Sequence, residues 1–290
     1  MDKIDTFLQT NLNNYVDETA ELCAQPSVSA RSEGVTECAT LVAQILTRHG
    51  FEVQTFQTPG HPIVVGHMKG PSTAAAATTA AAATTAAART LLLYNHYDVQ
   101  PPEPLDLWDS PPFEPTIRDD AIYARGASDD KGQFITRLAA VDAVRAAHDG
   151  TLPCNITFVV EGEEEIGSPH IASFVQAHTD LLKCQGSIWE GGGIDPDGHP
   201  INLLGARGIL GIELHITTMT RDAHSGNAHI LPNAAWRLVR VLETLKDPDT
   251  ERVRIPGFYD QAKPPSETDL ELLKALPAHE ALRKEVYGVE

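Results

Sequence analysis

Hydrophobic positions alternate between helical and strand-like spacing through the first part of the chain. Apolar residues recur at helical spacing from Ile4 to Leu22 and again between Glu33 and His49, where Gly50 ends the run. The same spacing indicates helices at 131–147 and 169–177. Short apolar runs predict strands at 51–56, 63–68, 91–96, 155–160 and 186–189, and a short hairpin at 117–123. Helices that alternate with strands predict an α/β fold, with helices on the faces of a sheet.

The pattern changes near Gly208. Residues 209–217 alternate apolar and polar side chains, as a half-exposed strand does, and 232–246 have the spacing of a helix that begins at a proline. Weak helical patterns follow at 269–275 and 279–287. We therefore predict two domains, residues 1–208 and residues 209–290.

An alanine- and threonine-rich tract at 70–88 interrupts the first domain. Its alanines favour a helix, but no apolar face repeats along it, so it has nothing to bury. We interpret it as a mobile low-complexity insertion in a loop between two strands.

Charge and composition narrow the class of protein. The formal net charge of -18 argues against nucleic acid or an anionic membrane as a partner. The four cysteines are far apart and form no CxxC pair, which is typical of reduced thiols rather than of a disulfide framework. The charged start of the chain lacks the apolar core of a signal peptide, and no apolar run approaches the length of a membrane span. A cytoplasmic location is the default expectation.

Candidate chemistry begins at the end of the strand predicted at 91–96, which carries His96 and, two residues later, Asp98. Polar groups at the end of a core strand are costly unless they are paired. His96 could ligate a metal ion while Asp98 holds the other ring nitrogen, or the histidine could simply be satisfied in a turn.

Three acidic motifs follow other predicted strands. Asp129 and Asp130 precede a helix, which they could cap, although one of them could instead bridge two metal ions. The run Glu161–Gly167 follows the strand at 155–160, where a solvated face competes with a metal ligand beside a general base. Glu190 lies in a glycine-rich turn that could simply be exposed. Four residues after four predicted strands form a mixed nitrogen and oxygen ligand set suited to zinc, manganese or cobalt: His96, Asp129, Glu165 and Glu190.

The second region offers one further candidate. His224 stands between small residues in the sequence Asp222-Ala223-His224-Ser225-Gly226, which predicts a tight turn that presents the imidazole. The simpler interpretation is an exposed loop histidine.

Together, these motifs resemble the M20 metallopeptidases, and the branch that is most similar is the cytosolic dipeptidase or carnosinase type. The resemblance rests on four stretches, residues 96–101, 126–132, 164–168 and 222–226. Trp108 with Pro111-Pro112-Phe113 and residues 122–126 support it. It extends over essentially the whole chain apart from the tract at 70–88. The implied fold is a zinc-exopeptidase-like catalytic domain, with helices on both faces of a mixed sheet, and a smaller α+β lid and dimerisation domain that is incomplete here.

The resemblance also implies roles for individual residues. His96, supported by Asp98, would hold one of two divalent ions, and Glu190 would ligate the same ion. Asp129 would bridge the two ions, and Glu165 would ligate the second. Glu164 would be the general base. His224 would reach from the lid into the site of a partner subunit and stabilise the tetrahedral intermediate.

One departure from the family pattern affects the expected activity. The family's last metal ligand is a histidine near the end of a longer chain, and no histidine here stands in that context. We therefore expect a C-terminally truncated member in which the second ion binds weakly. Whether this chain alone is active stays open.

The expected reaction is hydrolysis of dipeptides or short peptides by a homodimer, through a water that bridges two ions. The ions are expected to be zinc, with manganese or cobalt as alternatives. An amidohydrolase of the same fold acting on N-acyl amino acids is the nearest alternative. A non-catalytic dimerising fragment is the second.

Overall fold

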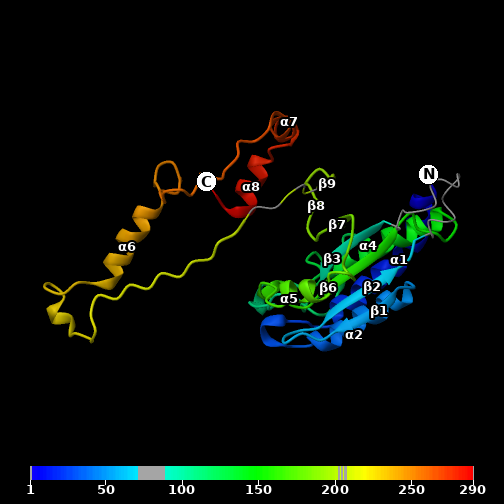
Figure 1. Ribbon diagram of the computed structural model, residues 1–290, viewed down its shortest axis with the longest axis horizontal. Coiled ribbons are helices and arrows are strands. Elements are labelled where there is room, and N and C mark those ends of the chain that lie inside the picture. The colour runs from blue at the N-terminus through cyan, green and yellow to red at the C-terminus, as the bar shows by residue number, and fades with distance from the viewer. Residues whose placement is uncertain (1, 71–88, 202, 204, 206–207, 290) are drawn as a thin grey trace. The chain divides into compact units, whose positions relative to one another are not determined.

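The computed structural model describes residues 2–70, 89–201, 203, 205 and 208–289. All but the first residue of the tract at 70–88 lies outside these ranges. The chain forms two compact units, Met1–Gly193 and Ile194–Glu290 (Figure 1). The predicted division after residue 208 stays a prediction.

A five-stranded mixed sheet organises the first unit, in the order β1-β2-β6-β3-β7. Strand β3 lies between β6 and β7 and runs parallel to both, whereas β2 is antiparallel to β1 and β6. The strands have these bounds: β1 (Glu52–Phe56), β2 (Ile63–Met68), β3 (Thr90–His96), β6 (Asn155–Glu161) and β7 (Gly186–Ile188). The prediction of an α/β fold with a mixed sheet is confirmed.

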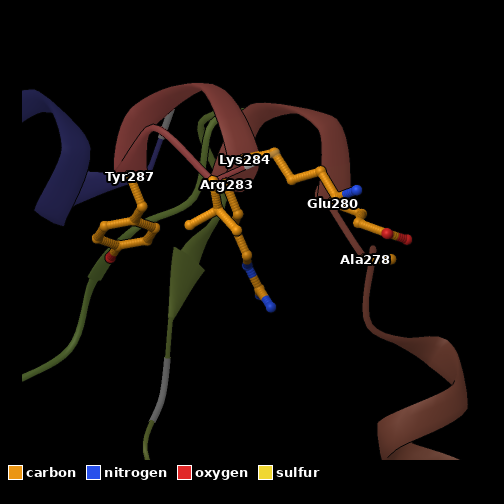
Figure 2. A pocket seen from close by; sticks show the side chains of 6 residues that line it. Ala278, Glu280, Arg283, Lys284 and Tyr287 are labelled. Atoms are coloured by element: carbon orange, nitrogen blue, oxygen red, sulfur yellow. The ribbon is translucent and has the colours of Figure 1, made fainter.

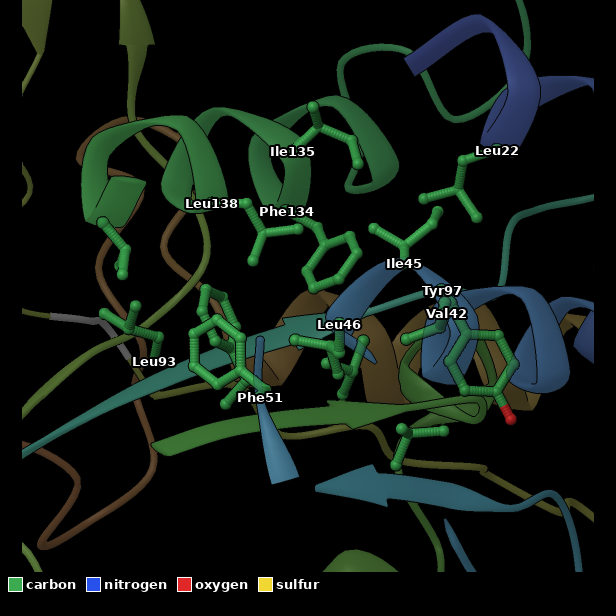
Figure 3. Close-up of a cluster of buried hydrophobic side chains, with 14 of the residues drawn as sticks. Leu22, Val42, Ile45, Leu46, Phe51, Leu93, Tyr97, Phe134, Ile135 and Leu138 are labelled. Carbon is green, nitrogen blue, oxygen red and sulfur yellow. The ribbon is translucent and has the colours of Figure 1, made fainter. Parts of the chain in front are cut away.

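Helices cover both faces of this sheet. The larger core lies between one face and three helices, whose side chains meet those of the sheet in Figure 3: α1 (Lys3–Ala24), α2 (Val35–Arg48) and α4 (Lys131–Ala147). On the other face, Phe174 of α5 (Ile171–Ala177) packs with a smaller cluster of strand residues, namely Ile63, Val65, Leu92, Tyr94 and Val159. The strand side chains alternate between the two cores, as a buried sheet requires.

Short elements complete the first unit. The predicted hairpin is formed by β4 (Thr116–Arg118) and β5 (Ala121–Tyr123). In the connections that the structure describes lie the 3-10 helices η1 (Ser29–Arg31), η2 (Leu105–Leu107) and η3 (Glu164–Ile166). The last begins three residues after the end of β6 and contains part of the acidic run.

Among its described residues, the second unit contains three helices: α6 (Ala234–Leu245), α7 (Glu267–Ala275) and α8 (Glu280–Tyr287). It also contains the 3-10 helix η4 (Ser225–Asn227), and a small hairpin of β8 (Gly193–Ile194) and β9 (Pro200–Ile201) lies at its start. The prediction of a strand at 209–217 is wrong, because no strand forms there among the described residues. Ile209 is 99% exposed, and an alternating segment becomes a strand only when another strand supplies its hydrogen bonds.

A hollow of about 410 Å³ lies beside α8 and is lined by Ala278, Glu280, Arg283, Lys284, Tyr287 and Val289 (Figure 2). Glu280 supplies the one carboxylate of that lining, so the hollow lacks the donors of a metal site. No helix among the described residues combines the length and the hydropathy that a bilayer-spanning segment needs.

A partly buried histidine ties three helices of the first unit together. His49 caps the end of α2, and its ring nitrogens lie 2.5 Å from Asp142 on α4 and 2.9 Å from Glu18 on α1. Its side chain is 11% exposed. Burial opposes the charged form, but the two carboxylates outweigh burial and raise the pKa of His49 to about 9.

This cluster predicts a pH-dependent stability. Because the folded pKa of His49 lies above its ordinary value of 6.5, its contribution is complete below about pH 6.5 and is lost as the pH rises through 9. At pH 6 the free energy of unfolding of the wild type should exceed that of His49→Gln. This difference should be smaller by about 3 kcal/mol at pH 10. Urea unfolding of both chains at the two pH values checks this. A wild-type advantage that is independent of pH would contradict it.

Candidate metal centre

The centre of the site is His96, which ends β3 in the middle of the sheet. Its side chain is fully buried. Its Nδ1 lies 2.9 Å from the carbonyl oxygen of Asp98 and 3.3 Å from the Asp98 carboxylate. Two acceptors on that side favour the tautomer with the proton on Nδ1, so the lone pair of Nε2 faces the opposite side.

Asp98 has a second task. Its two carboxylate oxygens accept hydrogen bonds from the backbone N–H groups of Glu164 and Glu165, each at 3.1 Å. The residue that faces the His96 ring therefore also fixes the start of η3. The prediction from the sequence named only the contact of Asp98 with His96 and not its contacts with Glu164 and Glu165.

Carboxylates from three other segments surround Nε2 of His96. Asp129 Oδ1 lies at 2.9 Å, Glu190 Oε2 at 3.2 Å and Glu164 Oε2 at 3.9 Å. Two sets of three residues each offer ligand atoms within 4.8 Å of one another: His96, Asp129 and Glu165, and His96, Asp130 and Glu190. The structure thus brings together six of the seven residues predicted from the sequence.

The local backbone explains how Asp129 reaches this point. The loop before α4 folds back closely, and a Cβ on Gly132 would stand 2.0 Å from the carbonyl oxygen of Ala127. Only glycine permits this approach. The adjacent Asp130 is fully buried and accepts hydrogen bonds from the side chain of Asn95 at 2.7 Å and from the backbone N–H of His96 at 3.0 Å.

Two buried oxygens test whether a cation fits here. Asp130 Oδ1 and Glu190 Oε2 are inaccessible to solvent and have no hydrogen-bond partner among the described residues. Buried carboxylate oxygens are costly when unpaired, and nitrogen and oxygen donors in this mixture suit zinc or a similar divalent ion. The residues therefore fit a metal ion.

The pKa values show the same excess of negative charge. Burial raises the pKa of Glu190 to about 8 and that of Asp130 to about 6. Burial lowers the pKa of His96, but hydrogen bonds to Asp129 and Asp98 outweigh it and raise the value to about 11. Without a metal, protons thus compensate the clustered carboxylates. A divalent ion would displace these protons when it binds.

Sequence reasoning missed two supporting residues. The first is Asp130. Asp129 and Asp130 were treated as alternatives, whereas Asp129 faces Nε2 of His96 and Asp130 accepts a hydrogen bond from the backbone at the end of β3. The second is Gln100, whose side-chain amide donates to the Glu165 carboxylate at 2.8 Å. The position of Gln100 four residues after the end of β3 was the available signal.

His224 belongs to the second unit and is exposed there. Its Nδ1 accepts a hydrogen bond from the backbone N–H of Gly226 at 3.0 Å, and His224 caps η4. The predicted tight turn is therefore present. The catalytic role of His224 stays a prediction.

A third set of possible ligands, Asp195, Asp197 and His199, lies in the turn between β8 and β9. Asp195 accepts hydrogen bonds from the backbone N–H groups of Asp197 and His199, at 2.9 and 2.8 Å. These bonds account for the acidic side chain through the turn itself. The His199 side chain is 73% exposed, so this set lacks the buried, unpaired oxygens of the His96 site.

The fold and the site together define a class of protein. It is an α/β protein with a candidate metal-binding site, formed by a buried histidine and carboxylates at the carboxyl end of a parallel strand. Residues 92–288 match the model of peptidase family M20/M25/M40, and the chain belongs to this family. The resemblance seen in the sequence is thereby confirmed.

Individual relatives are consistent with the dipeptidase branch. The chain is 31% identical to the human Beta-Ala-His dipeptidase over 195 residues, which cover 64% of this chain and 37% of the relative. It is 26% identical to the Cys-Gly metallodipeptidase dug1 of Schizosaccharomyces pombe over 283 residues, covering 90% of this chain and 55% of the relative. The chain therefore spans about a third to about half of the length of these curated relatives.

A solved structure supports the fold. The M20 family metallo-carboxypeptidase Sso-CP2 from Sulfolobus solfataricus superposes with a TM-score of 0.78 at 34% identity, over 94% of this chain and 59% of that chain. The expectation that the family's last histidine ligand is missing stays a prediction.

The site predicts that zinc binding depends on His96. Replacing His96 by Ala removes the single nitrogen donor of the cluster and should weaken zinc binding more than 100-fold, beyond the range for loss of a supporting residue. His199→Ala, in the exposed hairpin, is the matched control and should leave the affinity unchanged. Competition with a fluorescent chelator at pH 7.5 measures both. Equal affinities of His96→Ala and wild type would place the zinc elsewhere.

Proposed function

We propose that the protein hydrolyses dipeptides or short peptides with the help of bound divalent metal ions. The observation that supports this most directly is the ring of carboxylates around Nε2 of His96, in which the buried Oε2 of Glu190 makes no hydrogen bond among the described residues. Membership of the M20/M25/M40 family and the dipeptidase activities named for its relatives support the same reaction.

The proposed ligands follow from how each carboxylate is already used. In this proposal His96 and Glu190 would hold one ion, Glu165 would hold a second, and Asp129 would contribute to both. Asp130 is not assigned the bridge, because its Oδ2 already accepts two hydrogen bonds. The Asp129 side chain is 71% exposed and can offer both oxygens. We propose zinc for both positions, with manganese or cobalt as alternatives.

When bound, such ions supply an acidified water and polarise the substrate carbonyl. Glu164 is the proposed general base. Burial raises its pKa, which suits a carboxylate that takes a proton from water and later passes it to the leaving amine. Asp98 fixes the backbone of Glu164 and so holds this carboxylate near the ligands.

We propose that the second unit mediates the formation of a homodimer. The proposed location of the enzyme is the cytoplasm. Helix α6 exposes apolar side chains, among them Trp236 at 71%, Val239 at 51% and Leu242 at 49%. Exposed apolar surface of this kind favours burial against another protein surface. We propose that a second copy covers it and that His224 stabilises the oxyanion of the tetrahedral intermediate in the site of the partner subunit.

Replacement of Glu164 by Gln tests the proposed reaction. The amide keeps the shape of the side chain but accepts no proton, so kcat on Cys-Gly or β-Ala-His should fall about 100- to 10,000-fold while zinc stays bound. Glu37→Gln, an exposed change on α2, is the control and should keep wild-type turnover. Turnover of the zinc-loaded chain measures both.

Two results would contradict the proposal. Wild-type kcat in Glu164→Gln with zinc bound would show that Glu164 is not the base. Turnover of N-acetyl or N-succinyl amino acids, with none of the dipeptides hydrolysed, would favour the alternative amidohydrolase.

A further inference from the structure

Helix α4 begins directly after Asp130 and carries two polar side chains beside the metal-binding segments. Gln133 and Arg137 are four residues apart and therefore lie on the same side of the helix. Neither side chain offers a metal ligand in the structure. Both contact the backbone next to residues that do.

Gln133 connects the Asp129 loop to the turn that contains Glu190. Its amide nitrogen donates to the carbonyl oxygen of Ser128 at 3.0 Å, and its amide oxygen accepts from the backbone N–H of Gly191 at 2.9 Å. One side chain thus bridges the residue before Asp129 and the residue after Glu190.

Arg137 connects the end of β3 to the same turn. Its guanidinium donates to the carbonyl oxygen of Tyr94, to the side-chain oxygen of Asn95 at 3.0 Å and to the carbonyl oxygen of Trp189. Its planar fork of donors can satisfy several acceptors at fixed angles. The residues just before His96 and just before Glu190 are therefore held by one group.

The turn that contains Glu190 has little else to fix it. Strand β7 pairs over three residues, and all three are exposed. Three glycines with positive φ, residues 191–193, follow Glu190. Trp189 stacks on Tyr94 at 3.8 Å between ring centroids but remains 57% exposed. A segment with so few buried contacts depends on its hydrogen bonds for its position.

We propose that Gln133 and Arg137 are positioning residues that fix Glu190 relative to His96 and Asp129 and thereby set the affinity of the metal centre. This inference rests on the proposed function. It assigns to α4 a role beyond packing against the sheet, because the two hydrogen bonds to the turn flank a proposed ligand on both sides.

Zinc affinity of the full chain tests the proposal. Arg137→Met and Gln133→Ala should each weaken zinc binding about 10- to 100-fold, the range for loss of a residue that supports a ligand. Arg137→Lys keeps one point donor in place of the fork and should recover part of the loss. Competition with a fluorescent chelator gives the dissociation constants.

Arg145 supplies the matched control on the same helix. It donates to the carbonyl oxygen of His49 at 3.1 Å and to the Asp142 carboxylate at 3.0 Å, away from the metal-binding segments. Arg145→Met should lower stability and leave zinc affinity within twofold of wild type. An equal loss of affinity in Arg145→Met and Arg137→Met would reduce Arg137 to a structural role and overturn the proposal.

A second readout needs no metal. In a background with Trp108→Phe and Trp236→Phe, Trp189 is the one tryptophan of the chain. Arg137→Met should then increase the quenching of Trp189 fluorescence by acrylamide, whereas Arg145→Met should not. Equal quenching in Arg137→Met and its parent would overturn the positioning role. A wild-type chain that binds no zinc would instead overturn the proposed function.

Discussion

The candidate site depends on one physical constraint, the burial of the His96 imidazole among carboxylates. Strand β3 has neighbours on both edges, so its last residue lies inside the protein. The ring can be satisfied on its Nδ1 side by Asp98, but Nε2 faces an excess of acidic groups. Such a cluster is stable when protons or a cation compensate it, and the second solution yields a metal centre.

The surrounding fold serves to keep these carboxylates in place despite their mutual repulsion. Asp98 fixes the start of η3, and Asp130 fixes the end of β3. Arg137 of α4 donates a hydrogen bond to Asn95, next to His96. The start of α4 is itself anchored by the buried Lys131, whose ammonium group donates to the carbonyl oxygens of Leu22 and Gln25 at the end of α1. A charge cluster is thus held by a hydrogen-bonded frame that reaches the first helix, as a rigid metal site requires.

Much of this arrangement could be predicted from the sequence. Apolar runs located the strands, and polar residues at or after the ends of three parallel strands located His96, Glu165 and Glu190, because parallel strands present their carboxyl ends at one edge. Asp129 follows the separate antiparallel hairpin of β4 and β5, and its place just before α4 was the signal there. Gln133 and Arg137 could not be found in this way. They look like ordinary helix residues, and their partners are up to 58 residues away in the chain. The prediction of a strand at 209–217 was wrong for a related reason. A strand depends on a neighbouring strand, and periodicity does not reveal whether one is present.

The most direct test of the metal centre is anomalous X-ray diffraction at the zinc edge from crystals of the zinc-loaded chain. The account predicts a peak about 2.0–2.2 Å from Nε2 of His96 and from carboxylate oxygens of Asp129 and Glu190. Crystals without a peak at His96, or with one confined to the exposed hairpin of Asp195 and His199, would contradict it.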